Sequence, residues 1–209
     1  MSLGWHKHLP LALAALLLPA ILFGAAAPYP SSAAGSDPLV GKLLVASPGM
    51  GERLFYRTVI LIVEHNEGGA LGIVINQPFE ERSIASLLEG IGKKEPGVEG
   101  SVRIFAGGPM EPSIGFIVHS TDYRRPETLD IDGRIAMTSS PEVLRDMGHK
   151  KGPQKSLIAF GYTGWGPGQL EVELARHDWF TIPEDPKLIF DDDRKQVWTN
   201  AMARLGQVL

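Results

Sequence analysis

A carboxylate, an imidazole and an amide stand together at the end of one apolar run. Glu64, His65 and Asn66 directly follow residues 58–63, which are all β-branched or apolar. At the exit of a buried strand, such groups could form an acid–base pair at the rim of a cleft. With His119 they define one hypothesis, an enzyme of unknown type. The alternative is structural, because Asn binds backbone amides in turns and tolerates left-handed geometry, and we favour this interpretation.

Other catalytic signatures are missing from the sequence. Ser47 and Thr138 are the hydroxyl groups that this enzyme would have nearby, but Ser47 stands between Ala46 and Pro48 and not in a Gly-x-Ser-x-Gly elbow. The chain has no cysteine, which excludes disulfides, thiolate metal sites and cysteine nucleophiles. The histidines are dispersed and lack the i, i+4 spacing of a helical ligand pair, so we expect no metal site. We expect no cofactor either.

The charge balance disfavours direct binding to nucleic acid. The 209 residues carry 20 basic and 24 acidic side chains, a net charge of −4. A protein held on phosphates by neutralisation would carry an excess of basic groups. The basic clusters at Arg124–Arg125 and at 149–155 fall in expected loops or at a helix end, where solvated charge is the ordinary outcome.

The N-terminal residues match a secretory signal. His6, Lys7 and His8 precede an apolar stretch from Leu9 to Phe23 and small residues at 25–27. The stretch is shorter than the roughly 20 residues that span a bilayer. We therefore expect a signal peptide at 1–27, a Pro-, Ser- and Ala-rich linker at 28–38 and the folded domain at 39–209.

This organisation predicts an exported, periplasmic protein with no permanent membrane span after cleavage. Two alternatives stay open at this point. The N-terminal segment could remain as an uncleaved anchor, or the protein could be cytosolic.

Two apolar runs predict the elements that hold the Glu64–Asn66 cluster. Residues 58–64 and 70–76 have no polar face to turn toward water, and a five-residue loop ending in glycine separates the apolar runs. We expect a β-hairpin that is buried on both faces at the centre of a sheet. Further strands are expected at 43–46, 102–106, 114–119, 131–137 and 156–160.

Capping signals predict the helices, and one segment is ambiguous. Residues 170–174 alternate like a strand, but Pro167 and the spacing of Leu170 and Leu174 suit a helix, which we favour. The strands outnumber the helices and do not alternate with them regularly, so the fold class is α+β. The other expected helices are 83–90 with Ser83 as cap, 140–147 with Ser140 as cap, and a last helix capped at 191–193 that ends near Gly206.

Seven short motifs occur in the order that one protein family shows. They are Pro48–Met50, Val63–Asn66, Gly72–Pro78, Gly107–Pro109, Gly115–His119, Asp132–Gly133 and Gly161–Glu171. On these motifs, which extend over residues 39–206, the chain resembles the bacterial YqgE/AlgH family. The resemblance implies a single α+β domain with a mixed, bent β-sheet folded toward a pseudo-barrel and flanked by a few helices. It also implies a transcriptional regulator, usually cytosolic, without an assigned reaction, cofactor or substrate.

We therefore predict a non-catalytic binding or regulatory domain whose partner is a protein or a small molecule. Three aromatic side chains near glycines, Tyr162, Trp165 and Trp179, can form an open platform for such a partner, although side chains of this kind more often close one end of a sheet. The functional surface is expected to gather polar and aromatic groups from turns at the ends of buried strands. They are Ser47, His65, Asn66, Asn76, Tyr162 and Trp165.

Overall fold

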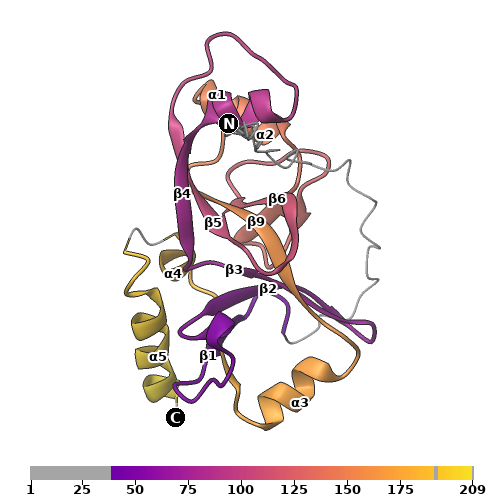
Figure 1. The fold of residues 1–209 in the computed structure, drawn as a ribbon, viewed down its shortest axis with the longest axis vertical. Helices are drawn as coiled ribbons and strands as arrows, with labels where there is room; N and C mark the ends of the chain where they lie inside the picture. The colour runs from indigo at the N-terminus through magenta and orange to yellow at the C-terminus, as the bar shows by residue number, and fades with distance from the viewer. Residues whose placement is uncertain (1–38, 191–192, 209) are drawn as a thin grey trace, which may run out of the picture.

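A bent, mixed sheet runs through the whole of the computed structural model, which describes residues 39–190 and 193–208 (Figure 1). Within these residues the sheet has ten strands, in the order β10-β1-β2-β3-β9-β6-β8-β7, with β5 paired in parallel to β9 and β4 paired to β5. The strands are β1 (Leu43–Ala46), β2 (Val59–Asn66), β3 (Gly69–Val74), β4 (Pro78–Ser83), β5 (Ser101–Ala106), β6 (Met110–Ser120), β7 (Leu129–Asp130), β8 (Ile135–Thr138), β9 (Ser156–Trp165) and β10 (Trp179–Ile182).

Helices cover the sheet at both ends of the molecule. In Figure 1, α1 and α2 lie at the upper end, α3 at the lower end, and α4 and α5 along one side. Their bounds, with a short 3-10 helix, are η1 (Arg53–Phe55), α1 (Ile84–Gly90), α2 (Glu142–Gly148), α3 (Gln169–Ala175), α4 (Pro186–Phe190) and α5 (Val197–Val208). The α+β class and the mixed, bent sheet are confirmed. Across the described part of the chain, no helix is long and apolar enough to cross a membrane.

The strand β9 joins the two parts of the sheet. Its first residues pair with β5 and β6, and Thr163–Trp165 pair with β3. Gly161 lies between these stretches with φ +76°, and a side chain there would overlap the backbone of Gly108. The glycine therefore lets the chain bend while the two segments stay in close contact.

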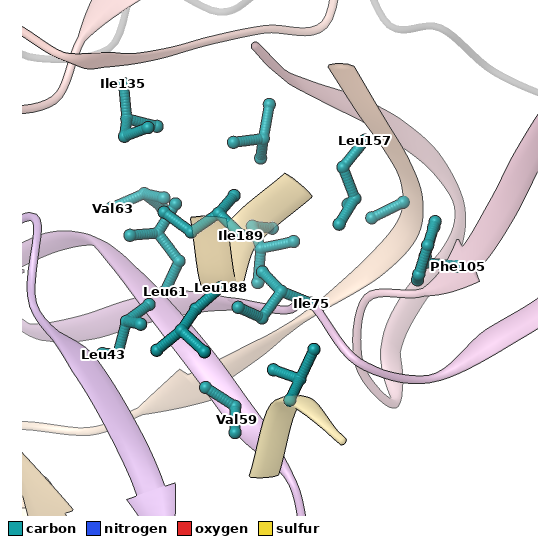
Figure 2. Packing of buried hydrophobic residues seen from close by; sticks show 14 of the residues in the cluster. Leu43, Val59, Leu61, Val63, Ile75, Phe105, Ile135, Leu157, Leu188 and Ile189 are labelled. Atoms are coloured by element: carbon teal, nitrogen blue, oxygen red, sulfur yellow. The ribbon is translucent and has the colours of Figure 1, made fainter. Parts of the chain in front are cut away.

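The expected hairpin is confirmed as β2 and β3, and it is buried on both faces. Val59, Leu61 and Val63 face a central core, and Ile60 and Ile62 face a second core beneath α3, which we call the α3-side core. Figure 2 shows the central core, where side chains from β1, β2, β5, β8, β9 and α4 converge. The five-residue loop was wrong: the strands extend to a two-residue turn, because Asn66 pairs with Gly69.

Several other boundaries differ from the expectations. The helix at 169–175 is confirmed, and β9 runs on to Trp165 instead of ending at Phe160. The expected strand 131–137 begins too early: residues 131–134 form a turn between β7 and β8, and only 135–137 belong to a strand. In this turn Asp132 accepts hydrogen bonds from the amides of Arg134 and Ile135. The helix α2 begins after Pro141 with no side-chain cap, so the Ser140 cap was wrong.

Four short elements were not expected, namely η1, β4, β10 and α4. The strand β4 is a polar edge strand that starts with proline, and β10 and α4 are only 4 and 5 residues long. Short polar or edge elements carry little hydrophobic periodicity, so sequence patterns detect them poorly. Residues 1–38, with the expected signal peptide and linker, lie outside the described residues, as do two of the three residues expected to cap the last helix.

Candidate functional site

Two adjoining hollows form a groove beside η1 and the end of β9. Their volumes are about 420 Å³ and about 100 Å³, and Leu54, Phe55 and Pro109 line both. We call this surface the η1–β9 groove. Its apolar walls and floor are formed by Met50, Leu54, Phe55, Pro109, Met110, Trp165 and Trp179.

The floor of the groove is a cluster of aromatic rings. Phe55 meets Trp179 edge to face with centroids 5.6 Å apart, and Trp165 meets Trp179 in the same way at 6.2 Å. Both indoles are buried, with 7% and 3% of their surface exposed. Edge-to-face pairs of this kind add stability beyond the area they bury, so the floor is a rigid part of the α3-side core.

One carboxylate on α3 fixes both indoles. Glu173 Oε2 accepts the N–H groups of Trp165 and Trp179 at 2.8 and 2.9 Å, and its Oε1 accepts the amide of Gln169 at 2.8 Å. Gln169 Oε1 in turn accepts the backbone N–H of Gly166 at 3.1 Å. Because buried indole N–H groups need acceptors, Glu173 holds the rings in one orientation and ties α3 to the sheet.

Glycines allow the walls of the groove to approach each other. A side chain at Gly108 would overlap the backbone of Tyr162, and a Cβ at Gly164 would lie 2.9 Å from Met110 Sδ. Thr163, which directly precedes Gly164, donates its hydroxyl to the carbonyl of Gly72 at 2.9 Å. The β9 backbone is therefore held against β3 on one side and against the start of β6 on the other.

The charged groups that line the groove are mostly acidic. They comprise the carboxylates of Glu52, Glu173 and Asp178 and the guanidinium of Arg176, so three negative charges less one positive charge leave an excess of two negative charges. Arg176 donates from Nε and Nη2 to Asp178 Oδ2 at 2.9 and 2.5 Å. The Glu52 carboxylate is exposed and makes no side-chain hydrogen bond or ion pair with the described residues.

Of the six residues expected at a functional surface, Trp165 lines the groove, and His65 lies on the same face of the sheet. His65 pairs with Ala70, which pairs with Trp165 in the next strand, so the three residues form a row beneath α3. The imidazole Nε2 of His65 lies 2.6 Å from Glu171 Oε1 on that helix. Its contact thus joins the hairpin to α3.

Ser47 adjoins the groove through its backbone. Its N–H donates to the carbonyl of Asp178 at 2.9 Å, and its carbonyl accepts the N–H of Met50 at 3.0 Å. The turn that Ser47 begins therefore presents Met50 to the groove, while Ser47 itself is 9% exposed.

Asn66 and Asn76 make structural hydrogen bonds. Asn66 Oδ1 accepts the N–H of Gly68 at 2.7 Å, and its Nδ2 donates to Glu64 Oε1 at 2.8 Å. Asn76 Oδ1 accepts the N–H of Val59 at 2.9 Å and its Nδ2 donates to the carbonyl of Arg57 at 2.8 Å. These bonds shape the hairpin turn and join the end of β3 to the start of β2.

Tyr162 lies on the other face of the sheet. It packs against the central core, with its ring edge to face with Phe116 at 6.2 Å. Tyr162 and Trp165 are three residues apart in β9, and alternation along a strand places such residues on opposite faces. The structure therefore groups Trp165, His65 and Ser47 near α3 and places Tyr162 away from them.

The residues of the enzyme hypothesis do not converge on one place in the fold. Glu64 pairs with Leu71, which packs on the central core, whereas His65 points to the α3 side. His119 pairs with Ser156 at the start of β9, and His65 aligns with Trp165 at its end. The ten residues of β9 span up to about 30 Å in an extended strand. These groups do not form a common site.

His119 is a buried side chain of the upper part of the sheet. Its Nδ1–H donates to the carbonyl of Ser120 at 2.9 Å, and its ring lies edge to face with Tyr123. Within the described residues its Nε2 has no hydrogen-bond partner. Burial lowers the pKa of His119, so the imidazole is held in its neutral form. Thr138, on β8, is also buried.

The basic clusters have carboxylate partners. Arg124 pairs with Asp130, and Arg125 Nη2 lies 2.6 Å from Asp146 Oδ2. His149 Nε2 lies 3.1 Å from Glu95 Oε1, and Lys150 Nζ lies 4.0 Å from Glu99. Among the described residues, no group of three or more acidic or histidine side chains is arranged to hold a metal ion.

A larger hollow of about 850 Å³ lies between β5 and the segment that joins α2 to β9. Its charged lining is of mixed sign and comprises Glu81, Glu99, Arg103, Lys150 and Arg194. Met147 forms part of its wall. None of the most exposed large apolar side chains of the described chain lines it, in contrast to the η1–β9 groove.

Most of the groove was missed in the sequence. Leu54, Phe55 and Met110 lie in segments without hydrophobic periodicity, and the sequence does not show which side chains Glu173 contacts. Trp179 was expected as a platform aromatic, but its place in β10 was not. One signal was available: an apolar pair, Leu54-Phe55, stands in a segment otherwise rich in Gly, Arg and Glu. Apolar side chains in a turn region often belong to a binding surface.

The fold and the groove together define a single-domain α+β protein with a bent mixed sheet and a preformed surface hollow. The family model described as AlgH-like matches residues 43–209, and the chain belongs to this AlgH-like family. The resemblance seen in the sequence is thereby confirmed.

Relatives and solved structures agree with this assignment. A UPF0301 protein of Jannaschia sp. strain CCS1 is 43% identical over 170 residues, which cover 80% of this chain and 88% of that protein. The solution structure of the AlgH protein from Pseudomonas aeruginosa matches with a TM-score of 0.69 and 38% identity, covering 83% of this chain and 93% of that one. A crystal structure of a Corynebacterium diphtheriae protein matches with a TM-score of 0.62 and 26% identity, covering 80% and 87%.

Proposed function

We propose that this domain is a non-catalytic binding domain that docks a partner protein through the η1–β9 groove. The observation that carries the proposal is an exposed apolar rim above a rigid aromatic floor. Leu54 and Met110 expose 57% and 44% of their surface at the groove. Large apolar side chains that gather around a hollow are typical of interaction surfaces.

Further exposed apolar groups lie close by along the chain. Tyr56, directly after η1, is 56% exposed. Gln77 lines the smaller hollow, and Phe79, two residues later in β4, is 75% exposed. These side chains enlarge the area that a partner could cover. Methionine at the rim also suits a docking surface, because its flexible thioether adapts to different shapes.

The polar groups of the groove support binding instead of chemistry. Glu173 is engaged by two indoles and an amide, and Asp178 is paired with Arg176. A general base must be within reach of a proton on its substrate, and these carboxylates already accept hydrogen bonds within the protein. The groove offers a fixed shape and a fixed charge, which are the requirements for recognition.

A regulatory role by protein contact is compatible with export. The N-terminal signal predicted at 1–27 would place the domain in the periplasm, where a partner surface can act and a genome cannot be reached. The transcriptional role implied by the family resemblance would instead require the cytosolic alternative, and it would reach the genome through a partner protein.

Capture from native cells with matched variants tests the proposal. Leu54→Ser removes an exposed apolar side chain at the groove, and Val172→Ser removes one on α3, where 56% of Val172 is exposed outside the groove. We expect the same captured protein with the parent chain and with Val172→Ser, and a loss of at least about ten-fold with Leu54→Ser. Equal capture by both variants, at equal melting temperatures, would show that the groove does not dock the partner.

A further inference from the structure

The charged side chains that line the groove indicate the charge of the group that it binds. Around an apolar cavity of about 420 Å³ stand three carboxylates and one guanidinium. The guanidinium of Arg176 is bound to Asp178, so it is not directed toward an incoming anion. Glu52 at the rim is exposed and has no side-chain partner within the described chain. A cationic group entering the groove would therefore meet a favourable potential, and an anionic group an unfavourable one.

Resting on the proposed function, we propose that the groove binds a peptide segment in which an apolar side chain stands next to a lysine or arginine. The apolar side chain enters the cavity above the aromatic floor, between Met50 and Met110. The basic side chain reaches the rim at Glu52. The occupant is thus a basic, apolar segment of a partner protein.

The size of the cavity fits one anchored side chain and its neighbours. Ligand sites in proteins usually occupy several hundred Å³, and this cavity lies near the lower end of that range. The smaller hollow beyond Phe55 and Pro109, lined by Val74, Ala106 and Gly108, has space for a second, smaller apolar group. A segment with an apolar side chain on each side of the basic residue would offer one apolar group to each hollow.

Calorimetric titration of the full chain with three blocked peptides tests this inference. The peptides are Ac-Gly-Leu-Lys-Leu-Gly-NH2 and its counterparts with Glu or Ser in place of Lys. We expect the Lys peptide to bind at least about ten-fold more tightly than the Glu peptide, because the sign of one charge is reversed near two net negative charges. Raising the salt from about 50 to about 300 mM should reduce this preference several-fold.

Two variants test whether Glu52 is responsible for the preference for the Lys peptide. Glu52→Gln should weaken binding of the Lys peptide by about three- to ten-fold without changing binding of the Ser peptide. Glu67→Gln, at an exposed position in the β2–β3 turn outside the groove, is the matched control and should change neither. The melting temperature of both variants should equal that of the parent.

The outcomes separate this inference from the proposed function. Equal binding of the Lys and Glu peptides, abolished in both cases by Leu54→Ser, would overturn the basic segment and leave the groove as the docking surface. Binding that Leu54→Ser leaves unchanged would overturn both. The inference is also overturned if no peptide binds, or if the groove is covered by a second copy, seen as a dimer that Leu54→Ser dissociates.

Discussion

Glu173→Ala should destabilise the domain more than the truncation of any other polar side chain on α3. The carboxylate accepts three hydrogen bonds, two from the indoles of Trp165 and Trp179 and one from Gln169. Alanine removes every acceptor while keeping the helix propensity high. The two indole N–H groups would remain in the α3-side core, because their rings pack there against each other.

The size of the loss follows from the burial of the donors. A buried donor without an acceptor costs roughly 1–3 kcal/mol. Trp165 and Trp179 are 7% and 3% exposed, so water has little access to them, whereas the exposed Gln169 can turn toward solvent. Two unpaired indoles predict a loss of about 3 kcal/mol in the free energy of unfolding. In a domain of this size, that loss lowers the melting temperature by roughly 6–12 °C.

Chemical denaturation followed by tryptophan fluorescence measures this loss directly. Glu173→Gln retains one oxygen for the indoles and should lose only about 1 kcal/mol. Glu171→Ala is the control on the same helix, and we expect it to lose no more than about 1 kcal/mol, because the Glu171 side chain is 52% exposed in its contact with His65. A Glu173→Ala variant within about 0.5 kcal/mol of the parent would refute the role assigned to this carboxylate.

Further predictions concern the core, two buried titratable groups and the N-terminus. Ile62→Asp places a charge at a position with 0% exposure in the central hairpin, so the cooperative thermal transition should disappear; melting near the parental temperature would contradict this. Burial lowers the pKa of His119, so the unfolded chain binds its proton more readily and stability should fall as the pH drops below about 6.5; denaturation curves of His119→Phe should lack this part of the pH dependence. Burial and the neighbouring Asp132 raise the pKa of Glu184 to about 7, so the folded chain holds this proton and stability should fall as the pH rises from about 4.5 to about 7; Glu184→Gln should flatten that slope, and an unchanged slope would refute the assignment. Mass spectrometry of protein from native cells should find residues 1 to about 27 removed, and an intact Met1 would exclude the cleaved signal.

The sequence predicted the buried strands well because their chemistry is local. The runs at 58–64 and 70–76 contain only apolar or β-branched residues except at their ends, and such segments form strands that are buried on both faces. The helix at 169–175 was also predicted, although its alternating residues suggested a strand. Its amphipathic face, with Leu170 and Leu174 on the α3-side core, explains why the helix forms.

The groove could not be predicted because long-range pairing assembles it. Leu54, Met110 and Trp179 come from three segments that β9 and β10 bring together, and no local pattern connects them. The glycines around Tyr162 suggested a loop, although β9 continues through them to Trp165. If the strand had been predicted to continue to Trp165, the alternation of side chains along it would have placed Tyr162 and Trp165 on opposite faces of the sheet. The sequence did not indicate the role of Glu173, because its hydrogen-bond partners are indoles on two strands, β9 and β10.

Methyl NMR of methionine-labelled protein can show directly whether a partner docks in the η1–β9 groove. Met50 and Met110 line the groove, Met137 is buried in the central core, and Met147 lines the larger hollow beside β5. On addition of the partner captured from native cells, we expect the methyl signals of Met50 and Met110 to shift while those of Met137 and Met147 stay in place. A shift at Met147 with unchanged signals of Met50 and Met110 would show that the partner binds at the other hollow and not in the η1–β9 groove.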